Sequence, residues 1–241
     1  MLFVTLASIM TMIEKNLQTV RERVAAACRA AGRQSGEVSV LAVSKTFSSQ
    51  DVACAAATGQ TAFGENYIQE AVQKMDALHH LKLQWHCIGP IQSNKTRLVA
   101  EHFDWVHTID RLKIAQRLSE QRPAPMAPLQ VCIQVNVDGG VSKSGVAPQE
   151  ALALAQQVAA LPKLRLRGVM SLPEPAIDFT SACAVFARVR AVYESLKAAG
   201  LPLDTLSMGM SADLEAAVHC GSTLVRVGTA IFGGRAKSVA V

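Results

Sequence analysis

The chain has 241 residues, of which 50% are hydrophobic and 18% charged, and its formal net charge is +5 at pH 7. A chain of this length and composition buries a large core without disulfides or metals, which excludes disordered, collagen-like and disulfide-stabilised proteins. The basic residues are scattered, and only 5% of residues are aromatic, so few side chains are available for stacking on bases. The composition argues against nucleic acid as a partner but is compatible with binding of a small anionic ligand.

The N-terminus and the cysteines indicate a cytoplasmic protein. The first residues, MLFVTLASIMTMI, are uncharged but lack a basic flank and are too short to cross a bilayer, so neither a signal peptide nor a membrane anchor is predicted. Met12 is an alternative start, and residues 1–11 are therefore predicted to be a non-native or disordered extension. The six cysteines form no C-x-x-C pair and lie in apolar segments, so we expect reduced, buried thiols.

The first predicted element is a helix from Met12 to about Ala31, because apolar residues recur there at every third or fourth position and Gly32 follows. Short β-branched runs then alternate with longer helical patterns. The strands are predicted at residues 38–45, 61–66, 83–89, 105–110, 129–136, 164–171, 204–210 and 224–229. The intervening helices are predicted at residues 49–58, 67–78, 94–101, 111–121, 148–161, 178–199 and 213–219.

This alternation predicts an α/β fold, a single (β/α)8 barrel of the TIM type with an additional N-terminal helix. Residues 12–241 would form that one domain. A doubly wound open sheet is the alternative, but eight strand–helix units are more than most open sheets carry.

Functional groups of such barrels lie at the C-terminal ends of the strands. Lys45 ends the apolar run VSVLAV. A lysine half-desolvated at a barrel mouth is a nucleophile for aldehydes, whereas an ordinary strand-end lysine is the alternative. The loops SMGMSAD (207–213) and RVGTAIFGG (226–234) follow the last two strands, where barrels most often bind phosphate. The last strand of a closed barrel neighbours the first, so this phosphate site would lie beside Lys45. A phosphate site next to an aldehyde-reactive lysine indicates a phosphorylated aldehyde such as pyridoxal phosphate (PLP).

Two further polar side chains lie in predicted strands. By strand alternation Arg226 points into the barrel mouth, where it either donates to a pyridine nitrogen or forms a buried salt bridge with an acid such as Glu65. A lone strand histidine such as His86 is more often a hydrogen-bonded core residue than a catalyst. The histidines show neither an H-E-x-x-H motif nor paired Cys/His spacing, so no metal site is predicted.

Seven motifs carry a family resemblance. They are AVSKT (42–46), FGENYIQE (63–70), WHCIGPIQSNK (85–95), VNVDGGVSKSG (135–145), RGVMS (167–171), LSMGMSADLEAAV (206–218) and GSTLVRVGTAIFGGR (221–235). Together they resemble the pyridoxal phosphate homeostasis protein family, which is similar to the N-terminal barrel of alanine racemase.

The resemblance implies a role for each matching site residue. Lys45 would be the Schiff-base lysine, and Arg226 would contact the pyridine nitrogen. Ser211 would hold the phosphate together with the backbone of Gly228 and Thr229. The residues expected to line the cofactor around them are Asn66, His86, Met208 and Gly209.

The family implies a PLP-binding protein of intracellular vitamin B6 homeostasis without robust catalysis. Its expected contacts are the cofactor and, transiently, PLP-dependent apoenzymes, and we expect a monomer. The alternative is an amino-acid racemase-like enzyme that uses Lys45 as one base, but the only tyrosines, Tyr67 and Tyr193, offer no obvious second base. A third reading is a barrel enzyme that acts on another phosphorylated aldehyde.

Overall fold

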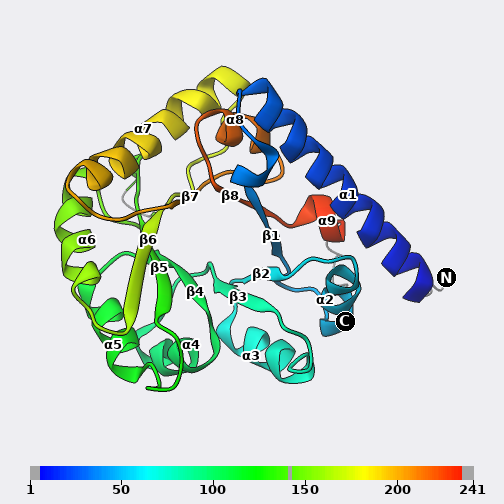
Figure 1. The fold of residues 1–241 in the computed structure, drawn as a ribbon, viewed down its shortest axis with the longest axis horizontal. Helices are drawn as coiled ribbons and strands as arrows, with labels where there is room; N and C mark the ends of the chain where they lie inside the picture. Colours follow the sequence, from blue (N-terminus) through cyan, green and yellow to red (C-terminus); the bar gives the residue numbers. More distant parts are fainter. Residues whose placement is uncertain (1–5, 141–142, 235–241) are drawn as a thin grey trace.

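The computed structural model describes residues 6–140 and 143–234, and these residues form a closed barrel of parallel strands surrounded by helices (Figure 1). The strands follow one another around the barrel in chain order, and the last is hydrogen-bonded to the first. They are β1 (Ser39–Val43), β2 (Ala62–Glu65), β3 (Gln84–Cys87), β4 (Trp105–Ile109), β5 (Leu129–Gln134), β6 (Leu164–Met170), β7 (Thr205–Ser207) and β8 (Leu224–Val227).

A helix follows each strand and covers the outside of the barrel. The helices are α1 (Leu6–Ala30), α2 (Ser49–Ala57), α3 (Ile68–Ala77), α4 (Thr96–His102), α5 (Leu112–Gln121), α6 (Ala151–Ala159), α7 (Phe179–Ala198), α8 (Leu214–His219) and α9 (Thr229–Phe232). Short 3-10 turns lie at Ser35–Glu37 (η1), Ser93–Lys95 (η2) and Pro148–Glu150 (η3).

Strand alternation separates the two sides of β1. Val43 and Lys45 line the cavity at the C-terminal mouth of the barrel. Ser44, between them, donates its hydroxyl to Glu65, and its carbonyl accepts from Lys74 of α3. Successive side chains of a strand point to opposite faces, so this short sequence determines which residues reach the mouth.

Helix α1 completes the outer layer beside the short α9. It packs against α2, α8 and α9 (Figure 1). Its apolar stripe is buried at Ile13, Leu17, Val20 and Val24. Because α9 has only four residues, α1 completes the outer layer between α8 and α2.

The predicted barrel with an N-terminal helix is confirmed, but α1 begins earlier than predicted. Residues 6–11 belong to this helix. The expectation that residues 1–11 are a non-native or disordered extension stays a prediction. A helix adds residues at little cost once its first turn exists, so the strong pattern after Met12 extends toward the N-terminus. Residues 1–5 lie outside the described residues.

The six cysteines are free, and all but the half-buried Cys183 are buried, as their apolar surroundings predict. Among the described residues, no helix combines the length and apolar character needed to span a membrane.

Candidate functional site

A cavity of about 320 Å³ opens at the C-terminal ends of the strands, within the size range of small-molecule sites. Segments that are far apart in the sequence contribute to its wall. The lining residues are Val43, Lys45, Asn66, Ile88, Met170, Leu172, Met210, Ser211, Ala212, Arg226, Gly228 and Thr229. The barrel thus brings together six of the residues predicted from sequence, namely Lys45, Asn66, Ser211, Arg226, Gly228 and Thr229.

The backbone on both sides of Lys45 is held by α3. The Lys74 ammonium donates to the Ser44 carbonyl at 2.8 Å, and the Thr46 amide donates to Glu70 Oε1 at 2.8 Å. Thr46 has φ = 68°, a left-handed conformation that costs energy for a β-branched residue. The half-buried Lys45 therefore projects from a turn that side chains of the next unit hold in place.

The same Lys74 forms a buried ion pair with Glu65. Lys74 Nζ lies 2.8 Å from Glu65 Oε1, and the Ser44 hydroxyl donates to the same oxygen at 2.7 Å. Burial raises the pKa of Glu65, and the nearby Lys74 opposes that shift. The alternative in which Glu65 pairs with Arg226 is wrong, because Glu65 faces α3 whereas Arg226 faces the barrel interior.

Arg226 is buried and held by oxygen acceptors. Its Nη1 donates to the carbonyl and to the hydroxyl of Ser207, both at 2.8 Å, and its Nη2 donates to the Ser171 carbonyl at 2.8 Å. Burial lowers the pKa of Arg226 to about 10, so the guanidinium remains charged at neutral pH. A guanidinium has five N–H donors, and these contacts leave two for a ligand in the cavity that Arg226 lines.

The two loops predicted to bind phosphate lie against α1. Arg23 donates to the Ser211 carbonyl at 3.0 Å and pairs with Glu215 at 2.8 Å. Asn16 donates to the Ile231 carbonyl at 2.9 Å, just after Gly228 and Thr229. Helix α1 therefore orients both loops.

The close approach of β1 explains the glycine at 228. A Cβ at this position would lie 3.2 Å from the Val43 carbonyl oxygen, tighter than ordinary contact. The glycine leaves its backbone accessible from the cavity, as an anion site requires.

One polar atom at this cavity is buried without a hydrogen-bond partner in the described part of the chain and could accept from a ligand. Asn66 Oδ1 is buried and has no hydrogen-bond partner among the described residues, although Asn66 lines the cavity. A buried acceptor of this kind is costly unless a donor reaches it. The cavity thus offers donors at the Lys45 amine, the Arg226 guanidinium and the backbone of Gly228, and an acceptor at Asn66 Oδ1. These groups fit a phosphorylated aldehyde that carries further polar groups on its ring.

Met208 and Gly209 do not line this cavity. Met208 is fully buried, and a Cβ at Gly209 would collide with Ala217 of α8. Gly209 has φ = +94°, which favours glycine, so these two residues pack the loop after β7 against α8.

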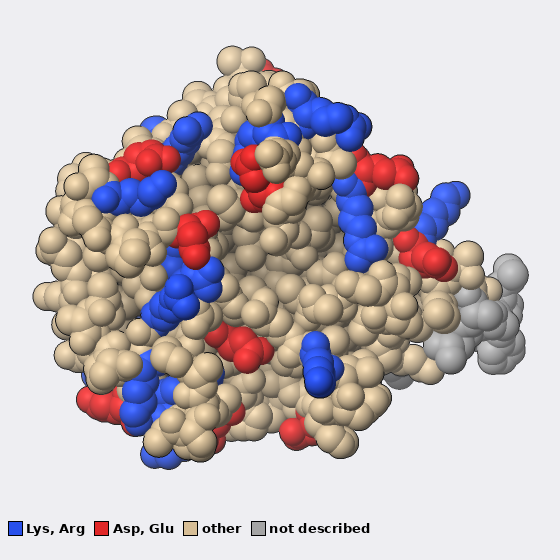
Figure 2. Space-filling view, in the orientation of Figure 1, with Lys and Arg blue, Asp and Glu red and all other residues tan. Residues whose placement is uncertain are grey.

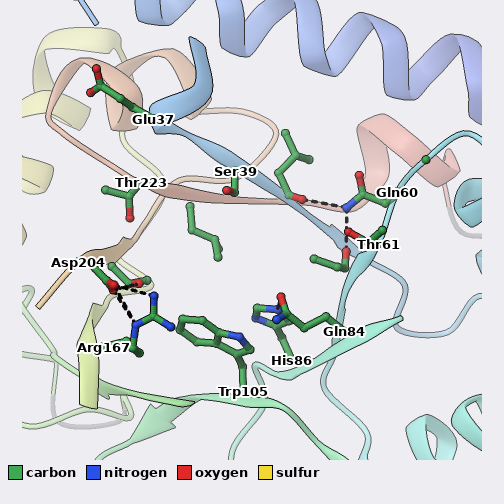
Figure 3. A pocket seen from close by; sticks show the side chains of 15 residues that line it. Glu37, Ser39, Gln60, Thr61, Gln84, His86, Trp105, Arg167, Asp204 and Thr223 are labelled. Atoms are coloured by element: carbon green, nitrogen blue, oxygen red, sulfur yellow. Dashed lines mark hydrogen bonds and ion pairs between the residues drawn. The ribbon is translucent and has the colours of Figure 1, made fainter. Parts of the chain in front are cut away.

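His86 is the clear correction to the expected site. It lines a different cavity, of about 520 Å³, at the N-terminal mouth of the barrel, beside Gln84 and Trp105 (Figure 3). Ile88, two residues further along the chain, lines the C-terminal cavity. His86 lies one layer deeper, where its register partner is Gly64 in β2.

Several polar groups of the N-terminal cavity are partners of one another, although Trp105 Nε1 is buried there without a hydrogen-bond partner among the described residues. Arg167 donates to Asp204 at 2.6 Å and to Gln130 at 2.8 Å, and its guanidinium lies 4.7 Å from the centroid of the Trp105 ring. His86 stacks on Trp105 at 5.2 Å (Figure 3). This end of a TIM barrel ordinarily serves stability, so we assign the functional site to the smaller C-terminal cavity.

Charged side chains of both signs surround the central hollow of the face in Figure 2. The described residues form no continuous basic stripe on this face of the kind that nucleic-acid backbones require.

The sequence reasoning missed His107 and Ser207, which contact each other inside the barrel at 3.0 Å, and Lys74 behind Lys45. A signal for the first two was present. Both occupy strand positions that alternation directs inward, where branched apolar residues are usual. Lys74 lies on the exposed-looking pattern of a surface helix, and nothing local identifies it.

Comparison with known proteins assigns these features to a family. Residues 14–236 match the family model of the alanine racemase N-terminal domain. The pyridoxal phosphate homeostasis protein of Pseudomonas aeruginosa is 57% identical over 226 residues, which cover 94% of this chain and 97% of the relative. That of Escherichia coli is 50% identical over 92% of this chain and 97% of the relative.

Solved structures agree. PipY of Synechococcus elongatus, a structure with PLP bound, superimposes with a TM-score of 0.80 at 34% identity, covering 92% of this chain and all (100%) of that chain. An alanine racemase of Corynebacterium glutamicum, at 19% identity and a TM-score of 0.71, shares the fold over 96% of this chain and 64% of the racemase.

Proposed function

The chain belongs to the pyridoxal phosphate homeostasis protein family, and on that premise we propose that it binds PLP at the C-terminal mouth of its barrel as a carrier of the cofactor. The observation that supports this most directly is the convergence of Lys45, Ser211, Arg226 and Gly228 on one cavity of about 320 Å³. PLP bound there supplies an aldehyde that reacts with amines and a phosphate dianion that needs N–H donors.

Each of these residues has a proposed task. The Lys45 amine would bond to the aldehyde carbon of the cofactor with release of the aldehyde oxygen as water, and its turn is set by Lys74 and Glu70. The Ser211 hydroxyl and the backbone at Gly228 and Thr229 donate to the phosphate.

Arg226, which lines the same cavity from β8, would donate to the ring nitrogen. Because its guanidinium stays charged at neutral pH, it leaves that nitrogen unprotonated, which weakens the ring as an electron sink.

The carrier role is favoured over racemisation by what surrounds Lys45. Of the described residues that line the cavity, only Lys45 and Arg226 have side chains that carry a charge. Tyr193 is buried in the helix layer, where its hydroxyl donates to Leu203, and Tyr67 does not line the cavity. Racemisation needs a proton donor on the face opposite the base, so this site supports retention of PLP better than turnover. We propose that the protein acts as a cytoplasmic monomer that passes PLP to apoenzymes.

The test of the binding site is covalent mapping. Purified protein is incubated with PLP, reduced with borohydride and digested, and the modified peptide is identified by mass spectrometry. We expect the adduct on Lys45 and its loss in Lys45→Ala, with Lys113→Ala, an exposed lysine of α5, as the matched control. An adduct confined to other lysines would contradict the proposed site.

The carrier role is tested separately with L-amino acids in deuterium oxide. We expect no racemisation by chiral chromatography and only slow exchange of the α-proton. Turnover of about 1 s⁻¹ or faster, the lower range of ordinary enzymes, would favour the racemase-like alternative.

A further inference from the structure

A continuous series of hydrogen bonds runs through the barrel interior from Arg226 toward the N-terminal mouth. Ser207 Oγ lies 2.8 Å from Arg226 Nη1 and 3.0 Å from His107 Nδ1. His107 Nε2 lies 2.9 Å from His86 Nδ1, and His86 Nε2 lies 3.0 Å from Gln84 Oε1. We call this set the polar string: Gln84, His86, His107, Ser207 and Arg226.

The polar string occupies space that most barrels of this type fill with branched apolar side chains. His86, His107 and Ser207 are each at most 1% exposed, so their polar groups have lost contact with water. Buried polar groups are costly unless every donor and acceptor is matched, and a complete network fixes one geometry. A polar string in place of an apolar core therefore indicates that a side chain at one of its ends must be held in one orientation.

The order of donors and acceptors along the polar string follows from its two ends. At one end the Arg226 guanidinium can only donate, and at the other the Gln84 amide oxygen can only accept. His86 consequently carries its hydrogen on Nε2 and accepts at Nδ1. His107 does the same, and it accepts the Ser207 hydroxyl hydrogen. Every member then donates toward Gln84.

Both histidines are neutral in this arrangement. Burial lowers the pKa of His86 to about 3, and burial together with the adjacent His86 and the Arg226 cation lowers that of His107. A protonated His107 could not accept from Ser207. The Ser207 hydroxyl hydrogen would then lose the acceptor that sets its direction.

We propose that His107 is a positioning residue for Arg226: by accepting the Ser207 hydroxyl hydrogen it fixes the rotamer that holds the guanidinium, and His86 and Gln84 hold His107 in the required tautomer. The inference deepens the proposed function, because the atom that Arg226 would orient toward is the cofactor ring nitrogen. Only Arg226 contacts the ligand cavity, so the other members act through it.

The binding test compares PLP with its 1-deaza analogue, in which a C–H group replaces the ring nitrogen. A hydrogen bond from a charged donor corresponds to roughly tenfold or more in affinity, so the wild-type protein should prefer PLP by about that factor. In Ser207→Ala and His107→Leu the preference should fall to about threefold or less. Ser222→Ala is the matched control, since that buried hydroxyl contacts Leu206, Met208 and Leu224 outside the polar string.

The ratio of the two affinities, for PLP and for the 1-deaza analogue, distinguishes a positioning role from a general effect on stability. A variant that merely loosens the barrel weakens both ligands equally and keeps their ratio, as we expect for Ser222→Ala. An unchanged ratio in Ser207→Ala would overturn the proposal, and this variant removes a single oxygen, so it tests the idea even if His107→Leu does not fold.

A second measurement needs no cofactor. Nitrogen-15 NMR of the imidazoles in the ligand-free protein should show His86 and His107 as neutral Nε2–H tautomers at pH 7. The Nδ1–H tautomer or an imidazolium at either position would overturn the polar string. Failure of wild-type protein to bind PLP would instead contradict the proposed function and leave this measurement intact.

Discussion

Lys74 and Glu65 form an ion pair that is closed off from solvent directly behind Lys45: their charged atoms are 2.8 Å apart, and their side chains are 6% and 0% exposed. The pair joins α3 to the end of β2, and the third hydrogen of the ammonium reaches the Ser44 carbonyl beside Lys45. Such a pair contributes little net stability relative to apolar residues, but it is costly to break on one side. Its value here lies in defining the turn from which Lys45 projects.

Lys74→Met should therefore destabilise the fold and slow the reaction at Lys45. Loss of the cation leaves the Glu65 carboxylate buried and unpaired, which costs about 3 to 5 kcal/mol. Urea denaturation measures this loss, and Lys113→Met on the exposed face of α5 should change stability by no more than about 0.5 kcal/mol. A loss below about 1 kcal/mol in Lys74→Met would show that Glu65 finds another partner.

Gly228→Asp should weaken PLP binding by at least about tenfold while the barrel remains folded. The new side chain would press on the Val43 carbonyl, 3.2 Å from its Cβ, and would bring a carboxylate to the proposed phosphate position. Equilibrium titration by absorbance measures the affinity. Gly36→Asp, in the exposed η1 turn where a Cβ meets nothing within 4 Å, is the control and should bind normally. Equal affinities in the two variants would place the phosphate elsewhere.

Arg23→Gln should separate affinity from stability. Its ion pair with Glu215 is partly solvated, with side chains 33% and 44% exposed, so its loss should cost at most about 1 kcal/mol. The loop at Ser211 loses its tie to α1, and PLP affinity should fall severalfold. Arg29→Gln, at an exposed position on the same helix, provides the comparison in both assays. If Arg23→Gln leaves affinity unchanged, α1 does not orient that loop.

The neutral histidines of the polar string predict acid sensitivity. The pKa of His86 is lowered to about 3 in the folded protein, against 6.5 for the free side chain, so between these values the unfolded chain binds a proton that the folded chain does not. Stability therefore falls as pH decreases through this window, by up to about 1.4 kcal/mol per pH unit for each such histidine. His86→Gln should reduce the slope of unfolding free energy between about pH 6 and pH 4.5 by that amount.

The exposed His80 is the control for this measurement, because its side chain is solvated whether the chain is folded or unfolded. His80→Gln should reproduce the wild-type slope. A wild-type slope in His86→Gln as well would mean that His86 is protonated inside the barrel or that the barrel opens around it.

The fold and half of the site geometry are local properties, and this explains why they could be predicted. Alternation with a period of two assigns Arg226 to the inside of the barrel, and the end of an apolar run assigns Lys45 to its mouth, before any tertiary contact is known. The order of strands in a closed barrel then places the loops after β7 and β8 beside Lys45.

The sequence by itself therefore determined the barrel, the inward faces of its strands and the cluster of Lys45, Ser211, Arg226 and Gly228. The tertiary structure alone decided depth and partners. Depth along the barrel depends on the stagger between neighbouring strands, which a pattern within one strand does not contain, so His86 lies below the cavity that Ile88 lines. Partners depend on packing between elements: Glu65 meets Lys74 rather than Arg226, and His86 meets His107 from the next strand, because only the closed barrel brings those atoms within hydrogen-bond distance.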